Sequence, residues 1–115
     1  MARTETEAYV LTRPVVRTSP VIFASPHSGR EYPADFLLQA VLDPRAIRSS
    51  EDAFVDELFG MAPGLGAPLL AARVPRAYID LNRAADELDS AVIEGIVRVP
   101  HNPRISSGLG VIPRV

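Results

Sequence analysis

A histidine follows the apolar residues 21–24, in the turn-forming segment Ser25-Pro26-His27-Ser28-Gly29. Imidazole nitrogens and carboxylate oxygens commonly make up hydrolytic zinc sites, which leave one position open for water. Asp52 and Asp56 are four residues apart, so a helix would place both carboxylates on one face. His27 combined with these carboxylates suggests a metal site. The alternatives are a turn histidine, an Asp52 that stabilises a helix start, and an Asp56 that is a solvated surface charge.

A second group of polar residues lies in the run Arg76-Ala77-Tyr78-Ile79-Asp80-Leu81-Asn82-Arg83. The guanidinium of Arg83 beside the amide of Asn82 suits bidentate recognition of a carboxylate, and Arg76 adds a further positive charge. The alternative is an edge strand in which Asp80 pairs with a nearby arginine, and spacing alone slightly favours it. The group therefore leaves open whether an acidic ligand is bound at all.

Short apolar segments are expected to position both groups. Residues 21–24 lie between two prolines and predict a buried strand that ends just before His27. In open α/β sheets, ligands bind beyond the carboxyl ends of the strands. Further strands are predicted at residues 69–74 and, from alternating apolar and polar residues, at 77–82. Weaker patterns suggest a strand at 92–99 and a glycine-rich turn leading into a strand at 106–115.

One helix is predicted between the first two strands. Ser49 or Ser50 can act as its N-cap, and Glu51 and Asp52 suit the positive end of its dipole. Its apolar face is made of Phe54, Val55, Leu58, Phe59 and Ala62. The fold class is therefore α/β with a mostly parallel sheet. Because one helix cannot cover both faces of such a sheet, we expect residues 1–115 to form a single domain that is the amino-terminal part of a larger one.

Composition excludes several classes of function. The chain has 115 residues without cysteine or lysine, which excludes thiolate zinc sites, lysine Schiff bases and P-loop lysines. A net charge of −2 with scattered arginines offers no surface for nucleic acid or an anionic membrane. No apolar stretch is long enough for a membrane helix, and the first residues lack the pattern of a secretory signal. We therefore expect a cytoplasmic protein.

Four segments, Ser25–Pro33, Glu51–Phe59, Arg76–Arg83 and Gly108–Arg114, follow one another along the chain. In that order they resemble the N-formylglutamate amidohydrolase family. Four matching segments in the correct order are far more specific than any one of them. The resemblance begins at about Val21 and extends over nearly all of the remaining chain, yet it covers less than half of a typical family member.

The resemblance implies a metal-dependent hydrolase that releases formate from N-formyl-L-glutamate, a late step of histidine degradation. The family is similar in fold to zinc carboxypeptidases and aspartoacylases, which implies part of a three-layer α/β/α sandwich with a mixed, mostly parallel sheet. His27 matches the first metal-binding histidine, and Asn82 and Arg83 match residues that hold the substrate carboxylate. Carboxypeptidases take a second ligand from a glutamate three residues after the histidine, where this chain has Arg30. The second ligand is therefore assigned to Asp52, the carboxylate that matches the recurrent Asp-x-x-x-Asp helix start of the family.

The resemblance leaves part of the site unassigned. The general base and a further metal-binding histidine of the family belong to a later segment, so no catalytic residue is assigned here, and His101 is expected in a turn. The expected cofactor is a divalent metal, with zinc as the first choice. The alternatives are a hydrolase of another N-acyl acidic amino acid and a non-catalytic binder of acidic amino acids. The expected partner is a small molecule, with self-association through an uncovered sheet edge as a further expectation.

Overall fold

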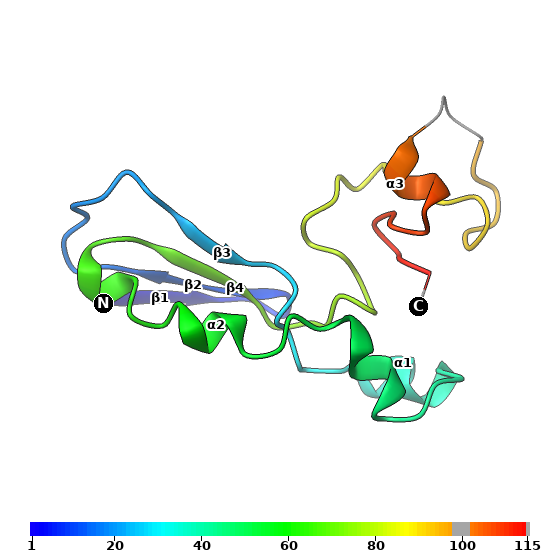
Figure 1. The fold of residues 1–115 in the computed structure, drawn as a ribbon, viewed down its shortest axis with the longest axis horizontal. Coiled ribbons are helices and arrows are strands. Elements are labelled where there is room, and N and C mark those ends of the chain that lie inside the picture. The colour runs from blue at the N-terminus through cyan, green and yellow to red at the C-terminus, as the bar shows by residue number, and fades with distance from the viewer. Residues whose placement is uncertain (98–101, 115) are drawn as a thin grey trace.

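The computed structural model describes residues 1–97 and 102–114 and shows an α/β chain of about 46 × 34 × 20 Å (Figure 1). The strands are β1 (Ala2–Glu5), β2 (Tyr9–Arg13), β3 (Phe23–Ser25) and β4 (Leu69–Ala72). The helices are α1 (Ala34–Gln39), α2 (Val55–Leu58) and α3 (Pro103–Ser106), with two 3-10 turns, η1 (Ala46–Ser50) and η2 (Pro63–Leu65). In the described part of the chain, no helix is long and apolar enough to cross a membrane.

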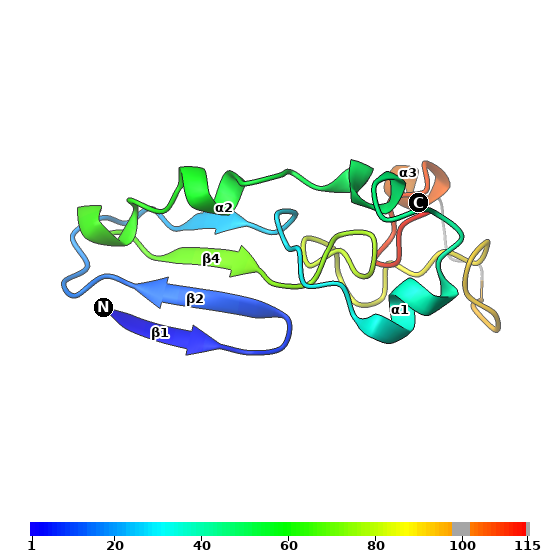
Figure 2. The same cartoon turned by 90° about the horizontal axis from the view of Figure 1, so that it is seen from below.

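The four strands form one mixed sheet in the order β1-β2-β4-β3 (Figure 2). β1 and β2 form an antiparallel hairpin, β2 pairs antiparallel with β4, and only β3 and β4 are parallel. The expectation of a mixed sheet is thus confirmed, whereas the described sheet is not mostly parallel. The difference arises from the hairpin, which the sequence analysis missed. Its turn is closed by the Thr6 hydroxyl, which accepts hydrogen bonds from the backbone N–H groups of Ala8 and Tyr9.

The two strands that were predicted to flank the site are present. β3 covers Phe23–Ser25, slightly later than the predicted residues 21–24, because the N–H of Phe23 donates the first bond to the Pro68 carbonyl at 2.9 Å. β4 is shorter than the predicted 69–74, since the N–H groups of Arg73 and Val74 both turn to the carbonyl of Ala8.

A small apolar core lies on one face of the sheet, beneath the segment that contains α2 and η2. Ala62, Ala67 and Leu69 are buried there, and Phe23 and Phe59 pack against them. The ring centroids of the two phenylalanines are 5.2 Å apart. Burial of these side chains holds the short helix against β3 and β4, because an isolated helix of one turn is unstable in water. The opposite face of the sheet carries no helix in the described residues. The three-layer sandwich remains a prediction.

The predicted continuous helix from Ser49 or Ser50 is wrong. Residues 46–50 form the 3-10 turn η1, the chain is extended at Glu51, and α2 begins only at Val55. The backbone N–H of Asp52 donates to the His27 carbonyl at 2.9 Å, which holds this residue out of a helix. Phe54 precedes α2 with φ of 65°, a left-handed conformation that is rare for a non-glycine residue.

The predicted strand at residues 77–82 is also wrong. The N–H groups of Tyr78 and Ile79 donate to the carbonyl of Pro75, which forms a turn, and the N–H of Asp80 donates to the carbonyl of Val111. These residues form a loop that contacts the carboxy-terminal segment, with Ala77 and Asp80 buried and Tyr78 and Leu81 exposed.

The remaining strand predictions fail in the described residues. Residues 92–97 form turns and bends, and residues 98 and 99 of that prediction lie outside the described chain. Residues 107–114 form a looped segment without a strand, and residue 115 of that prediction lies outside the described chain. They follow α3, whose N-cap Asn102 accepts a hydrogen bond from the N–H of Arg104 at 3.0 Å. His101, expected in a turn, lies outside the described residues.

Candidate functional site

The turn that carries His27 leaves the end of β3, next to the segment that follows β4. Because β3 and β4 are parallel, their carboxyl ends meet at the same edge of the sheet. The buried hydroxyls of Ser25 and Ser28 lie 2.6 Å apart and brace the turn. Gly29 lets the turn approach the second segment, since a Cβ at this position would overlap the backbone of Val74. These contacts explain why small residues surround the histidine.

The His27 ring lies between two carboxylates, one at each nitrogen. Nε2 is 2.8 Å from Oδ1 of Asp80, and Nδ1 is 3.5 Å from Oδ2 of Asp52. The His27 side chain is 12% exposed, that of Asp52 is 57% exposed and that of Asp80 is fully buried. The backbone bond between Asp52 and His27 keeps the outer carboxylate at this position. The structure thus brings together the two residues predicted as metal ligands.

Asp80 was not among the predicted site residues, yet it contacts His27, Asn82 and Arg76. Its Oδ1 accepts hydrogen bonds from Nε2 of His27 and from the N–H of Asn82, both at 2.8 Å. Its Oδ2 has no hydrogen-bond partner in the described residues and lies 3.4 Å from Nε of Arg76. The pairing with a nearby arginine, weighed as the alternative for this run, is therefore observed. The signal that could have identified Asp80 is an acidic residue two positions before Asn82.

The Asp80 carboxyl is held in its charged form. Burial raises its pKa, but the hydrogen bonds from His27 and from the N–H of Asn82 outweigh that effect, and the net pKa lies below the ordinary value. A carboxylate accepts hydrogen bonds and cannot donate one, so His27 must carry its proton on Nε2. The lone pair of Nδ1 then faces the carboxylate of Asp52. A cation between these two atoms, either a proton or a metal ion, relieves the repulsion.

The donor atoms of His27 and Asp52 fit two positions of a zinc ion. Two ligands about 2.0–2.1 Å from a tetrahedral zinc lie about 3.3 Å from each other. The observed separation of Nδ1 and Oδ2, 3.5 Å, is close to that value. A histidine that binds zinc usually donates its other N–H to a carboxylate, as His27 does to Asp80. Among residues 1–97 and 102–114, no group of three or more His, Asp or Glu residues is placed to hold a metal. The described residues bring two donor atoms, Nδ1 of His27 and Oδ2 of Asp52, within reach of one ion.

The predicted carboxylate-binding residues follow Asp80 directly. The side chain of Asn82 is exposed and borders a groove on the sheet. Nε of Arg83 donates to the carbonyl of Leu109 at 2.9 Å, and its Nη1 donates to the carbonyl of Asn82 at 2.8 Å. A guanidinium has five N–H donors, so Arg83 keeps donors for a carboxylate. Arg76, also predicted to bind substrate, instead lies beside Asp80.

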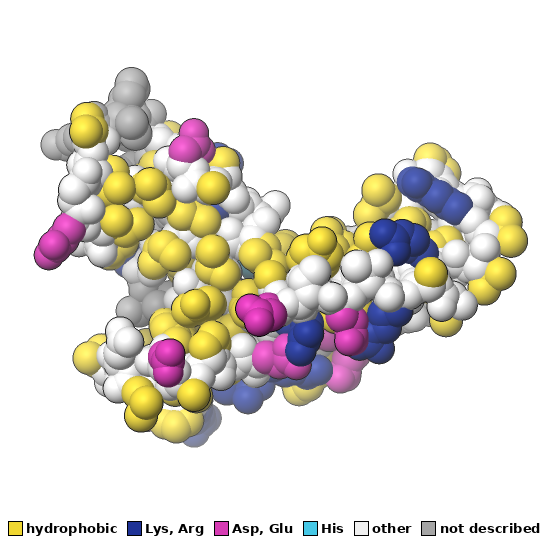
Figure 3. Space-filling model, turned by 180° about the vertical axis from the view of Figure 1, so that it is seen from behind, with side chains coloured by type: hydrophobic (Ala, Val, Ile, Leu, Met, Phe, Trp, Pro, Cys, Tyr) yellow, Lys and Arg dark blue, Asp and Glu magenta, His cyan; other side chains and the backbone are white. Residues whose placement is uncertain are grey.

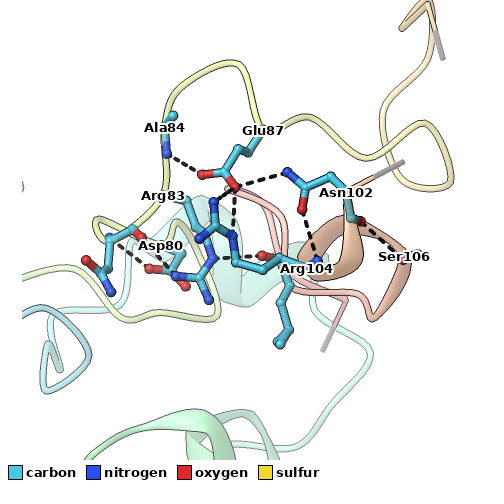
Figure 4. A network of polar contacts seen from close by, with 9 residues as sticks. Asp80, Arg83, Ala84, Glu87, Asn102, Arg104 and Ser106 are labelled. Atoms are coloured by element: carbon cyan, nitrogen blue, oxygen red, sulfur yellow. Dashed lines mark hydrogen bonds and ion pairs between the residues drawn. The ribbon is translucent and has the colours of Figure 1, made fainter. Parts of the chain in front are cut away.

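Two buried carboxylates fasten the carboxy-terminal segment to the loop after Arg83. Glu87 accepts hydrogen bonds from the N–H of Ala84 at 2.7 Å and from Nε of Arg104 at 2.9 Å (Figure 4). Asp89 accepts a bidentate pair from Arg114, at 2.6 and 3.0 Å. These bonds lower the pKa of both carboxyls below their ordinary values. The bonds to Arg104 and Arg114 hold residues 102–114 in place, including the Leu109 carbonyl that accepts the bond from Arg83.

A sequence model of the family described as N-formylglutamate amidohydrolase matches residues 19–115. The chain belongs to the N-formylglutamate amidohydrolase family. Among solved structures, it is similar to the crystal structure of N-formylglutamate amidohydrolase from Ralstonia eutropha JMP134, with a TM-score of 0.79 and 39% sequence identity. That similarity covers 93% of this chain and 38% of the Ralstonia eutropha chain. No curated protein matched significantly.

Membership of the N-formylglutamate amidohydrolase family confirms the resemblance drawn from the four sequence segments. The matched region contains His27, Asp52, Asp80, Asn82 and Arg83, and it excludes the whole amino-terminal hairpin of β1 and β2. The chain spans about 38% of the length of the solved amidohydrolase.

Proposed function

We propose that this chain provides part of the active site of a metal-dependent hydrolase that releases formate from N-formyl-L-glutamate, as in histidine degradation. The observation that carries the proposal is the His27 ring, which presents Nδ1 to Asp52 while the buried Asp80 carboxylate holds its Nε2. Asn82 and Arg83 follow immediately, as a donor pair suited to a carboxylate. Family membership supports the class of reaction, since the family is named for this amide hydrolysis.

Each of these residues has a distinct part in the proposed reaction. A divalent metal, with zinc as the first choice for nitrogen and oxygen ligands, supplies a Lewis acid and a bound water of lowered pKa. His27 and Asp52 would hold that ion, and Asp80 fixes the tautomer and orientation of the His27 ring. Asn82 and Arg83 orient the substrate carboxylate, which contributes proximity rather than bond cleavage. The general base is assigned to none of the residues of this chain.

A second candidate is binding of acidic amino acids without metal or catalysis. It is favoured by the incomplete set of metal-ligand side chains in the described residues. A third candidate is a hydrolase of another N-acyl acidic amino acid, which would use the same carboxylate-binding pair. The two hydrolases differ in the acyl group that they cleave, and the binder differs from both because it needs no metal.

Zinc titration of the purified chain by calorimetry separates metal binding from simple ligand binding. We expect zinc binding that is lost in His27→Ala, because Nδ1 of His27 faces Asp52. His101→Ala, which removes the other histidine of the chain, is the control and should retain zinc binding. Equal zinc affinity in the wild type and His27→Ala would contradict the proposed metal site. Formate release from N-formyl-L-glutamate, compared with release from other N-formyl and N-acetyl acidic amino acids, then tests the substrate. Arg83→Ala is expected to weaken binding of every substrate in that series.

A further inference from the structure

Two adjacent carboxylates, Glu51 and Asp52, lie in the segment that contacts the turn carrying His27. The backbone is extended at Glu51, with φ of −73° and ψ of 138°. Successive side chains of an extended chain point to opposite sides. In agreement, the Glu51 side chain is 3% exposed, whereas that of Asp52 is 57% exposed. The direction of the Glu51 side chain therefore determines the direction of the Asp52 carboxylate.

Two donors hold the carboxylate of Glu51. Its Oε2 accepts a hydrogen bond from the Tyr32 hydroxyl and lies 3.2 Å from Nε of Arg48, and its Oε1 accepts a bond from Nη2 of Arg48 at 3.3 Å. Burial and the bond to Glu51 raise the pKa of Tyr32 above its ordinary value, so the hydroxyl keeps the proton that it donates. Both oxygens of Glu51 are thus engaged by Tyr32 and Arg48 rather than by His27.

Burial distinguishes Glu51 from the acidic residues of the surface. Figure 3 shows acidic side chains beside arginines along one side of the molecule, where both are in contact with solvent. Such exposed pairs contribute little, because water screens the charges. Loss of a donor to a nearly buried carboxylate is more costly, since it leaves a desolvated charge unsatisfied. Glu51 is therefore a fixed point of the segment that leads to α2.

The Tyr32 hydroxyl reaches Glu51 from the same segment that carries His27. One contact between the two segments is the backbone bond from the N–H of Asp52 to the His27 carbonyl, at 2.9 Å. The bond from Tyr32 to the neighbouring Glu51 is a second contact. A single bond leaves a segment able to rotate about it, whereas two bonds at adjacent residues fix its orientation. Together they keep Oδ2 of Asp52 3.5 Å from Nδ1 of His27.

We infer that Tyr32 and Glu51 are positioning residues, which select Asp52 rather than Glu51 as the carboxylate that faces His27. Neither residue is proposed to touch the metal or the substrate, and both act through Asp52. The inference rests on the proposed function, in which His27 and Asp52 hold a metal. Loss of a group that orients a metal ligand typically costs about 10–100-fold in metal affinity, and Tyr32→Phe is expected to cost about tenfold because the contact from Arg48 remains.

Zinc calorimetry of the purified chain tests this expectation. Tyr32→Phe and Glu51→Ala should each weaken zinc binding, and Tyr32→Phe should add nothing further in the Glu51→Ala background, because both changes remove the same bond. Glu51→Gln, whose amide oxygen can still accept the bond from Tyr32, should retain most of the affinity. Tyr9→Phe is the matched control, since it removes a hydroxyl from β2, where Tyr9 is 36% exposed.

Nuclear magnetic resonance of histidine nitrogen-15 gives a readout that needs no metal. The chain has two histidines, so His27 and His101 give two sets of ring signals. Tyr32→Phe is expected to shift the Nδ1 signal of His27, because Asp52 is no longer held beside it, whereas Tyr9→Phe should leave that signal unchanged. Circular dichroism confirms that each variant is folded at the temperature of measurement. A merely structural role would lower the free energy of unfolding and leave the Nδ1 signal of the folded variant unchanged.

Equal zinc affinity of folded Tyr32→Phe and the wild type would overturn the inference, as would an unchanged Nδ1 signal. A full effect of Tyr32→Phe in the Glu51→Ala background would also overturn it, because the hydroxyl would then act through another partner. If the wild type binds no zinc while Tyr32→Phe still shifts the Nδ1 signal, the selection of Asp52 stands and the proposed metal-dependent function fails.

Discussion

Replacement of Asp80 by asparagine separates the charge of the buried carboxylate from its shape. The asparagine oxygen can still accept the hydrogen bonds from Nε2 of His27 and from the N–H of Asn82, which are both 2.8 Å long in the wild type. The substitution removes the negative charge beside Arg76, whose Nε is 3.4 Å away. It also weakens the hold on the His27 tautomer, because a neutral amide is a poorer acceptor than a carboxylate.

Two magnitudes follow from these contacts. Hydrogen bonds to charged groups contribute about 1.5–3 kcal/mol and neutral ones about 0.5–1.5 kcal/mol, so Asp80→Asn, which keeps the bonds but not the charge, is expected to lower the free energy of unfolding by about 1–1.5 kcal/mol. Loss of the carboxylate behind a metal-binding histidine typically costs about 10–100-fold in metal affinity, which is about 1.4–2.8 kcal/mol. The loss in zinc affinity is expected even at temperatures where the variant is fully folded.

Urea unfolding measures the first effect and zinc calorimetry the second. Asp86→Asn is the matched control, because Asp86 lies in the same loop with an exposed side chain. It should change the free energy of unfolding by less than about 0.5 kcal/mol. Unchanged zinc affinity in a folded Asp80→Asn variant would refute the argument that Asp80 orients a metal-binding His27.

Two further predictions concern the contacts that shape the site. Gly29→Ala places a Cβ against the backbone of Val74 and is expected to cost about 1–3 kcal/mol in urea unfolding, whereas Gly64→Ala, with open space around its Cβ, should cost little. Equal stability of the two variants would contradict the close approach. The hydrogen bonds from Arg114 lower the pKa of Asp89 in the folded protein. The pair therefore stabilises the fold fully above the unfolded-state pKa of about 3.9. This stabilisation is lost as the pH falls through the lower pKa of the folded state. The stability difference between wild type and Asp89→Asn, measured by unfolding across pH, should therefore shrink on acidification, and a constant difference would argue against an ionic contribution.

The sequence predicts those parts of the site that depend on local chemistry. β3 and the turn with His27 follow from an apolar segment bounded by prolines, and β4 follows from a second apolar segment. The pairing of His27 with Asp52 was predicted, although the helix that was expected to carry Asp52 does not form there. A backbone bond between the two residues, rather than a helix start, holds the carboxylate in place.

The parts that failed depend on contacts between distant segments. β1 is the edge strand and is mostly exposed, and β2 beside it is only partly buried, so neither strand needs a strong apolar pattern. The alternation at 77–82 predicts a strand only if a neighbouring strand is available, and the partner of Asp80 is instead the carbonyl of Val111. The role of Asp80 itself becomes clear only when His27, 53 positions earlier in the sequence, is seen at its Oδ1.

A single oxygen atom, Oδ1 of Asp80, joins the histidine ring to the backbone of Asn82. The separation between the two cannot change without lengthening one of two short bonds to a buried acceptor. In the proposed enzyme, the ring that would hold the metal and the backbone of the carboxylate-binding segment are kept at one separation. A change at either bond would therefore be felt at both residues, which are far apart in the sequence but share this one acceptor.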